Sequence, residues 1–538
     1  MSTAKIIAKG SAWMLVATFI VKFLGFIYLI ILARTVPEKE IGMFFLVLSV
    51  ISIVGLFSDF GLGIGAVARY VPFYAGKEKF NHVRKVLKIS LSAGTIFSII
   101  CTAFVILFAN DLASFFGNPN LVPIFYIMAF HFLISNVYST AYGFLQGRKL
   151  PNFVSYLVSV RDVSKVTLTL IFLFLIGFNA EGITVGYILA YLFTAVIGGY
   201  WLLKEYNLLP RSHEEANYFS LLKDMVPFGL TLVFISSMGM INTYTDRIML
   251  GYFFPGEVGE AMVGIYTMVI GFAMLINIFG GAIGTIFSPL ITEFWSKKDV
   301  SRINKTTITV IRWLSLTTLP LLLAMLIFPK QILTIIYGQD YAIGHIVLMI
   351  YSIGLFIYLF SQPSQWILAA MKRLDVTRKI IAVGATINVI LNFIFIPKYG
   401  INGAALTSAI SLTIMTILFL KQSKITNVQI PKDIYKPIIA GLITIILLFF
   451  LKPYMGEILR TIIPSLIQPT DIISEIIEKL LKIIVLGILV STAFLIYLIF
   501  LIQLKAFHKE DVEILSGAMR RLKIPKRWIS ITERVLLR

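Results

Sequence analysis

The stretch IGMFFLVLSVISIVGLFSDFGLGIGAVARY, residues 41–70, is long enough to cross a bilayer as a helix, yet it carries a carboxylate deep inside. An ionised side chain near the bilayer centre costs roughly 2.5–3.5 kcal/mol, so Asp59 is expected to face a protein-lined or watered cavity. Gly61, Gly63 and Gly65 follow at alternate positions. Because glycine loosens a helix and lets another backbone approach, the stretch predicts a bent or hinged segment that lines a cavity.

A buried carboxylate in a membrane also predicts a cationic partner. The nearest candidate is Lys22, in the first hydrophobic segment at about the same distance from the cytoplasmic side, roughly 20 Å at 1.5 Å per residue. Two apolar helices with opposite charges at one depth predict an ion pair between Lys22 and Asp59.

The composition of the whole chain agrees with a membrane environment. Its 538 residues are 58% hydrophobic and only 14% charged, and the mean hydropathy is +0.89. Apolar runs of about 20 residues favour transmembrane helices over the short alternating strands of a barrel. The sequence therefore predicts an all-α polytopic membrane protein with about 14 transmembrane helices.

The distribution of positive charge predicts the topology. The formal net charge is +20, and Lys and Arg gather in alternate loops and in the C-terminal tail. The positive-inside rule then puts both termini in the cytoplasm of a multi-pass protein of the cell membrane. The same uneven distribution argues against nucleic-acid binding.

The two halves of the chain share landmarks at an offset of about 220 residues, which indicates an internal repeat. Phe116-Gly117 matches Tyr337-Gly338, and GFNAEGITVGYIL at 177–189 matches KYGINGAALTSAI at 398–410. Each half holds about six spans, and this even number predicts two repeats of the same orientation with a cleft between them.

The predicted organisation follows from this repeat. It comprises two pseudo-symmetric six-helix lobes at 1–210 and 211–430, two additional C-terminal transmembrane helices within 431–505, and a basic cytoplasmic amphipathic tail at 506–538. In the tail, apolar residues on one stripe beside Arg and Lys predict contact with anionic lipids of the inner leaflet, with a solvated tail as the alternative.

Several motifs, taken in order, resemble a known family. They are SDFGLGIGAVARY at 58–70, TDRIMLGYF at 245–253, SPLITEFW at 288–295, YGQDYAIG at 337–344 and NVILNFIFIPKYGINGAALTSAIS at 388–411. Together they resemble the polysaccharide-biosynthesis flippases of the multidrug/oligosaccharidyl-lipid/polysaccharide exporter superfamily. The resemblance implies alternating access and movement of a polyprenyl-(pyro)phosphate-linked sugar from the inner to the outer leaflet. In the lipid II flippase branch it also implies a groove for the lipid tail between the last two helices.

Such a cargo needs cations inside a wet cavity. Arg161 and Lys165 are four residues apart, so they share a helix face and are suited to holding one phosphate. The alternative is that both reach the inner headgroups while Asp162 neutralises one of them. Asp59 is either a structural partner of Lys22 or a protonatable or sodium-binding switch that is released when cargo takes the lysine. The expected cavity residues are Lys22, Asp59, Arg69, Arg161, Lys165, Asn242, Asp246, Arg247 and Asn277.

Neighbouring positions in the seventh span set a further expectation. Asp246 and Arg247 do not share a helix face, so one is expected to point to the cleft and the other to a neighbouring helix or headgroup. Asn277, Asn388 and Asn392 are either glycan contacts or donors of interhelical hydrogen bonds.

Enzyme chemistry finds little support in the sequence. It contains no GxxxxGK[ST] phosphate loop, no HExxH and no Cys/His group with metal spacing, so we expect no enzyme, cofactor or metal. The expected partners are the lipid-linked oligosaccharide, anionic lipids and a glycan polymerase or transferase. Two alternatives to the flippase remain: an ion-coupled multidrug or organic-cation exporter of the same superfamily, and a non-transporting scaffold for glycan assembly.

Overall fold

The computed structural model describes residues 24–210, 214, 216–423, 435–466, 472–508, 511, 512, 516, 520 and 525–536. Every regular element in this described part of the chain is a helix. The predicted partner Lys22 lies outside the described residues, so its pairing with Asp59 stays a prediction.

The chain forms two compact units by internal contacts: 1–271 with 381–407, and 272–380 with 408–538. The predicted lobe boundaries at 210 and 430 stay predictions. The first unit contains α2 (Glu38–Val54), η1 (Gly55–Phe57), η2 (Leu62–Ala66), α3 (Val67–Ala75), α4 (Phe80–Leu107), α5 (Ala109–Phe115), α6 (Leu121–Ala129), α7 (His131–Gly147), α8 (Pro151–Ile176), α9 (Ala180–Asn207), α10 (Tyr218–Phe253) and most of α11 (Glu257–Ala273).

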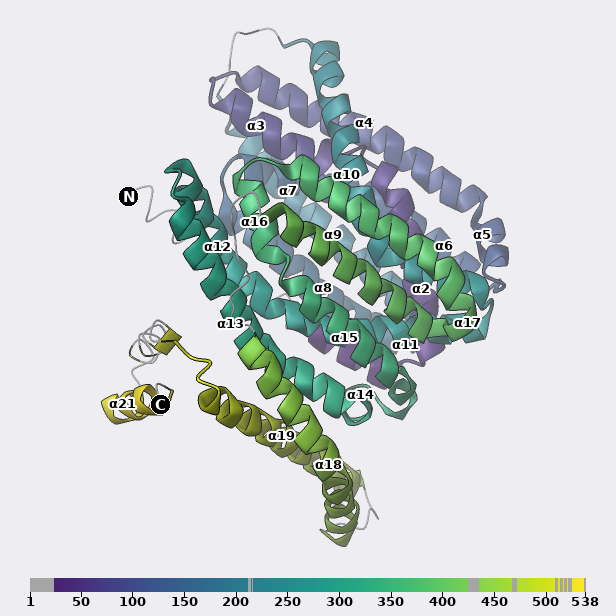
Figure 1. The fold of residues 1–538 in the computed structure, drawn as a ribbon. Helices are drawn as coiled ribbons and strands as arrows, with labels where there is room; N and C mark the ends of the chain where they lie inside the picture. Colours follow the sequence, from purple (N-terminus) through teal and green to yellow (C-terminus); the bar gives the residue numbers. More distant parts are fainter. Residues whose placement is uncertain are drawn as a thin grey trace. The chain divides into compact units, whose positions relative to one another are not determined.

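The second unit is built around α13, which packs against α12, α15 and α18. In Figure 1, α18 and α19 lie side by side. Helix α17 (Leu374–Ser423) contributes to both units. The remaining elements are η3 (Met274–Ile276), α12 (Asn277–Ser296), α13 (Val300–Ile327), α14 (Pro329–Ile336), η4 (Gln339–Gly344), α15 (His345–Leu359), α16 (Gln362–Ala370), α18 (Tyr435–Leu466), α19 (Ile472–Gln503) and α21 (Lys526–Leu536).

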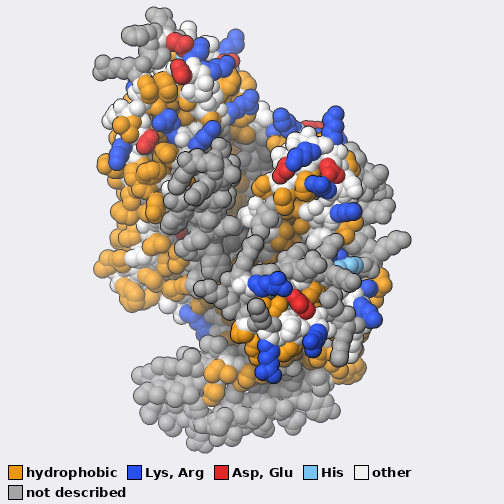
Figure 2. All heavy atoms as spheres, turned by 90° about the vertical axis from the view of Figure 1, so that its left-hand side faces the viewer, with side chains coloured by type: hydrophobic (Ala, Val, Ile, Leu, Met, Phe, Trp, Pro, Cys, Tyr) orange, Lys and Arg blue, Asp and Glu red, His pale blue; other side chains and the backbone are white. Residues whose placement is uncertain are grey.

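The described part of the chain contains nine helices that are long and apolar enough to cross a membrane. Three shorter apolar helices accompany them, at Leu24–Thr35, Tyr435–Phe450 and Gly487–Gln503. On the face drawn in Figure 2, hydrophobic side chains cover much of the described surface, and large side chains such as Phe174 and Leu107 are exposed. Exposed apolar surface on this scale fits a lipid environment. The protein is therefore a helical, multi-pass membrane protein.

The offset between the halves recurs in the helix boundaries. Helices α4 and α13 each have 28 residues and begin 220 positions apart, at Phe80 and Val300, and each is followed by a short helix. Left-handed backbone recurs too, at Gly117 and Gly338 and at Gly177 and Gly400. The left-handed Gly400 breaks α17 into two helices, as Gly177 separates α8 from α9.

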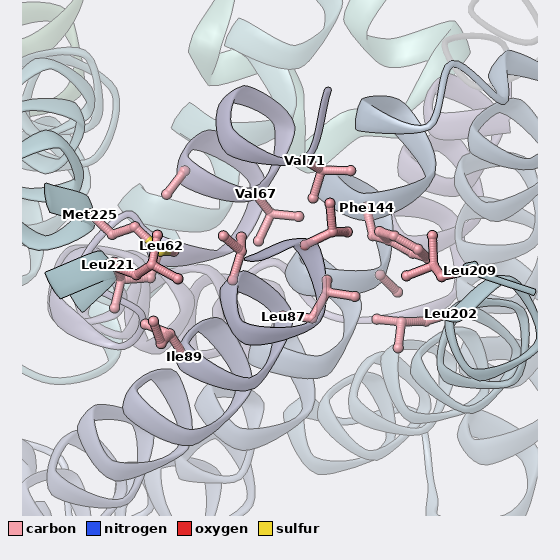
Figure 3. Packing of buried hydrophobic residues seen from close by; sticks show 14 residues of the cluster. Leu62, Val67, Val71, Leu87, Ile89, Phe144, Leu202, Leu209, Leu221 and Met225 are labelled. Atoms are coloured by element: carbon pink, nitrogen blue, oxygen red, sulfur yellow. The ribbon is translucent and has the colours of Figure 1, made fainter. Parts of the chain in front are cut away.

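Packing in the first unit is centred on the segment that follows Asp59. Leu62, Val67 and Val71 meet Leu87 and Phe144 in a buried apolar cluster, which Figure 3 shows from close by. Leu202 of α9, Leu209 just after that helix, and Leu221 and Met225 of α10 join the same cluster. This packing fixes the bent segment against α4, α7, α9 and α10.

The start of the C-terminal tail is attached to α13 in the second unit. Asp511 is 2% exposed and accepts hydrogen bonds from Arg312 Nη2 at 2.7 Å and Trp313 Nε1 at 3.0 Å. Most of the predicted amphipathic stripe lies outside the described residues, so tail contact with anionic lipids stays a prediction. Asp511 itself is buried in protein.

Candidate functional site

The apolar segment that carries Asp59 is bent, as its three following glycines predicted. Helix α2 ends at Val54, and the chain passes through η1 and a bend to the π-helical turn η2 before α3 begins. Phe60 and Gly61 have φ values of 47° and 70°, and the backbone at Gly63 is not helical. A carbon atom added at Gly61 would lie 2.5 Å from the Gly229 carbonyl oxygen, so this turn requires glycine.

A helix break exposes backbone groups that must be satisfied inside a membrane protein. Serines of α4 meet this need: Ser98 donates to the Ser58 carbonyl at 3.0 Å, and Ser90 donates to the Leu62 carbonyl at 3.0 Å. Asp59 closes the turn by accepting from the Gly61 amide at 2.8 Å and from Ser139 Oγ at 3.3 Å. These hydrogen bonds stabilise the bend.

The two predicted cations of α8 come together with the intervening acid. The Arg161 guanidinium donates two hydrogen bonds of 3.2 Å to Asp162, and Lys165 Nζ lies 3.8 Å from the same carboxylate. The side chains of Arg161 and Lys165 are 25% and 22% exposed, whereas that of Asp162 is only 7% exposed. Two partly accessible cations therefore share one buried carboxylate, which leaves a net positive charge.

Tyrosines from other helices surround this group. Tyr138 of α7 accepts a hydrogen bond of 3.3 Å from Arg161 Nη1, and its ring lies 5.8 Å from the guanidinium. The ring of Tyr191 lies 6.0 Å from the same guanidinium, and that of Tyr28 lies 5.0 Å from Lys165 Nζ. We call Arg161, Asp162, Lys165 and these three tyrosines the Arg161 cluster. Cation–π contacts hold the two cations in place without neutralising their charge.

Asp246 and Arg247 are both buried, and the expectation that one of them points to a cleft stays a prediction. Asp246 is 3% exposed and accepts hydrogen bonds from Tyr266 Oη at 2.6 Å and Asn392 Nδ2 at 2.7 Å. Arg247 is 8% exposed and lies over the rings of Phe45 and Tyr244. Asn392 thus makes the interhelical hydrogen bond that was one of its two expected roles, and it ties α17 to α10.

The other predicted residues are distributed differently. Arg69 is exposed, with its guanidinium 4.2 Å from the centre of the Phe228 ring. Asn242 is half-buried on α10. Asn277 belongs to the second unit, where its buried Oδ1 has no hydrogen-bond partner among the described residues. Among the described candidates of the first unit, the structure therefore gathers Arg161 with Lys165.

Sequence reasoning missed the tyrosines and Ser139. Tyr187 and Tyr191 are four residues apart on α9 and their rings lie 4.8 Å apart, which is a pattern that marks one helix face. Nothing in a single sequence links that face to Arg161 of α8 or to Tyr138 of α7, because such contacts depend on tertiary packing.

Comparisons with known proteins agree with this fold. The solved structure described as lipid II flippase MurJ in an inward closed conformation superposes with a TM-score of 0.65, at 18% identity, covering 90% of this chain and 97% of that one. An inward-facing multidrug resistance MATE family transporter gives a TM-score of 0.62 at 15% identity, covering 76% and 94%. The fold is therefore that of the MATE- and MurJ-like helical membrane transporters.

Sequence matches give the family. Residues 7–295 match the family described as polysaccharide biosynthesis protein, and residues 227–394 match the MatE family. The chain belongs to the polysaccharide biosynthesis protein family of the multidrug/oligosaccharidyl-lipid/polysaccharide exporter superfamily, a superfamily of transporters.

Individual relatives cover most of the chain. The membrane protein MJ1068 of Methanocaldococcus jannaschii is 26% identical, over 84% of this chain and 91% of its own length. The capsular polysaccharide biosynthesis protein CapF of Staphylococcus aureus is 23% identical, over 75% and 96%. The probable low-salt glycan biosynthesis flippase Agl15 of Haloferax volcanii is 22% identical, over 77% and 82%.

Proposed function

We propose that this protein is a flippase that moves a polyprenyl-(pyro)phosphate-linked oligosaccharide from the inner to the outer leaflet, for polysaccharide or glycoconjugate assembly. The observation that carries the proposal is the Arg161 cluster, where two partly accessible cations share one carboxylate. Names of relatives in glycan and polysaccharide biosynthesis support the choice of cargo.

The chemistry of the cluster suits a phosphate head. A guanidinium binds phosphate oxygens in a bidentate manner, and an ammonium adds a point charge. When the cargo phosphate approaches, it would compete with Asp162 for both cations, and the net positive charge of the group would favour the phosphate. Tyrosine rings and hydroxyls nearby are suited to sugar faces and sugar hydroxyls.

The proposal includes fourteen membrane spans in two lobes and an additional pair. When α17 is divided at Gly400 and the charged helix α8 is added, the nine long and three shorter helices come to fourteen spans. Twelve would form two six-helix lobes, and α18 and α19 would be the additional pair that receives the lipid tail. Both termini would face the cytoplasm.

The bend at Asp59 is proposed as the hinge of alternating access. Gly61 and Gly63 permit backbone geometry that other residues resist. In this proposal Lys22 pairs with Asp59 in one state and with cargo phosphate in another. A switch of partner of this kind would couple cargo binding to bending of the helix.

The second candidate is an ion-coupled exporter of organic cations. It is favoured by the match of residues 227–394 to the MatE family and by the buried carboxylate of Asp246. Such an exporter would use Asp59 or Asp246 for the cation, whereas the positive Arg161 cluster would repel it.

The deciding experiment uses the full chain in proteoliposomes. Leaflet exposure of a polyprenyl-pyrophosphate oligosaccharide is measured beside efflux of an organic cation under a sodium or proton gradient. We expect the chain to accelerate exposure of the glycan lipid over protein-free vesicles. Equal exposure with and without protein, together with cation efflux, would replace the flippase by the exporter.

A further inference from the structure

A basic hollow lies at one end of α4, and no residue of the Arg161 cluster lines it. It has a volume of about 420 Å³. Its wall on α4 is formed by Asn81, Arg84, Lys85 and Lys88, and the opposite wall by Tyr206, Glu214 and Ala216 around the connection from α9 to α10. The proposed transport mechanism gives these basic residues no role.

The far wall of the hollow is fixed by polar contacts to α4. Arg84 donates to the Leu209 carbonyl at 2.7 Å and to the Pro210 carbonyl at 3.2 Å. Asn81 Nδ2 donates to the Glu214 carbonyl at 2.9 Å. These bonds tie the backbone at Leu209, Pro210 and Glu214 to α4, so the hollow has walls of set spacing.

The wall that contains Tyr206 and Ala216 is also anchored in the apolar core. The side chain of Leu209 is 3% exposed and belongs to the apolar cluster of Figure 3, with Tyr206 and Ala216 packed against that cluster. The same residue therefore anchors its side chain in the core and its carbonyl on Arg84. A hollow built on a packed core keeps its shape without a ligand.

The charges that line the hollow are unevenly compensated. Arg84 is engaged by backbone carbonyls and by the ring of Tyr206 at 5.5 Å, contacts that leave its charge in place. The Glu214 carboxylate lies 3.6 Å from Lys79 Nζ. Among the residues that the structure describes, neither Lys85 nor Lys88 is in an ion pair. Both stand on one face of α4, three residues apart.

We propose that this hollow binds a phosphate group, with Lys85 and Lys88 as its ammonium donors and Arg84 as the fixed third charge. The phosphate belongs either to the headgroup of an anionic lipid or to a soluble phosphate or pyrophosphate. This site is independent of the transport site and does not rest on the proposed function.

The test measures two probes on the purified full chain. Binding of radiolabelled inorganic pyrophosphate is measured by equilibrium dialysis, and retention of phosphatidylglycerol against phosphatidylcholine is measured by native mass spectrometry. We expect one of the two probes to bind. Binding of pyrophosphate indicates a soluble ligand, and retention of phosphatidylglycerol indicates a lipid headgroup. The double variant Lys85→Ala/Lys88→Ala should weaken that binding about tenfold or more, because charge-assisted hydrogen bonds are lost.

Two matched variants complete the design. Lys85→Arg/Lys88→Arg keeps the charge and should keep binding within about threefold of wild type. Lys305→Ala/Lys379→Ala removes the same charge from exposed positions elsewhere and should bind as wild type does. The proposal is overturned if wild type binds neither probe, or if the Lys85/Lys88 alanine variant binds as tightly as the Lys305/Lys379 control.

Discussion

Tyr138 and Ser139 are neighbours on α7 that contact different charged centres. The Tyr138 hydroxyl accepts from Arg161 at 3.3 Å, and the Ser139 hydroxyl donates to Asp59 at 3.3 Å. Helix α7 also passes close to the bend, since a carbon atom added at Gly143 would lie 3.0 Å from the Gly63 carbonyl oxygen. One rigid helix therefore links the cationic cluster to the bent segment.

This link predicts separate effects for two conservative changes. Tyr138→Phe removes a hydrogen bond to the guanidinium, so cargo transport should slow several-fold with a stability loss of about 1 kcal/mol. Ser139→Ala removes a donor to the Asp59 carboxylate and should cost about 1–3 kcal/mol of stability. Transport rate and thermal unfolding of each purified variant check the pair. Unchanged transport in Tyr138→Phe would argue against α7 as the link.

The close approach at the bend predicts a steric effect. A carbon atom added at Gly229 of α10 would lie 2.2 Å from the Phe60 carbonyl oxygen. Backbone cannot yield as a flexible side chain does, so Gly229→Ala should destabilise the protein by about 1–3 kcal/mol and lower its melting temperature.

The matched control lies on the same helix. Nothing lies within 4 Å of a carbon atom added at Gly239. Gly239→Ala should therefore leave stability unchanged or raise it by up to about 1 kcal/mol, because alanine favours helix. Equal melting temperatures for the two alanine variants would show that the close contact between Gly229 and Phe60 does not limit stability.

The buried carboxylate of Asp246 predicts a difference between two tyrosines. Tyr266 is fully buried and donates to Asp246 at 2.6 Å, so Tyr266→Phe should cost about 1–3 kcal/mol. Tyr337 is equally buried, but its hydroxyl has no hydrogen-bond partner among the described residues. Tyr337→Phe should therefore be neutral or slightly stabilising. Chemical unfolding of both variants in detergent measures the two changes in the free energy of unfolding. A larger loss of stability in Tyr337→Phe than in Tyr266→Phe would contradict this prediction.

The attachment of the tail predicts strong coupling between Arg312 and Asp511. Asp511→Asn keeps an acceptor for Trp313 but leaves the Arg312 charge buried without its counter-ion, which should cost about 3–5 kcal/mol. Arg312→Met/Asp511→Asn removes both charges and should recover most of that loss. A thermodynamic cycle with the two single variants measures the coupling. Additive losses would mean that the pair contributes nothing as a pair.

Sequence alone predicted those features that depend on local pattern. Hydropathy predicted a helical membrane protein, and three alternate glycines predicted the bend after Asp59. Spacing of four placed Arg161 and Lys165 on one face, and the structure adds that both use Asp162. The offset of about 220 residues between repeat landmarks appears again in the bounds of α4 and α13.

Features that depend on tertiary packing escaped prediction. Asp246 meets Asn392 across 146 residues and Arg312 meets Asp511 across 199 residues. No periodicity in a single sequence encodes such a pairing, because helix spacing sets only which residues share a face. The predicted pair of Lys22 and Asp59 would also be a tertiary contact, and it stays a prediction.

The most direct test of the central claim replaces the two cations of the Arg161 cluster. In proteoliposomes, leaflet exposure of a polyprenyl-pyrophosphate oligosaccharide is followed for wild type, Arg161→Gln/Lys165→Gln and the exposed control Lys305→Gln, each checked for folding by its melting temperature. The account predicts that the double variant loses transport at least about tenfold while the control keeps it. Full transport by a folded Arg161→Gln/Lys165→Gln variant would contradict the account.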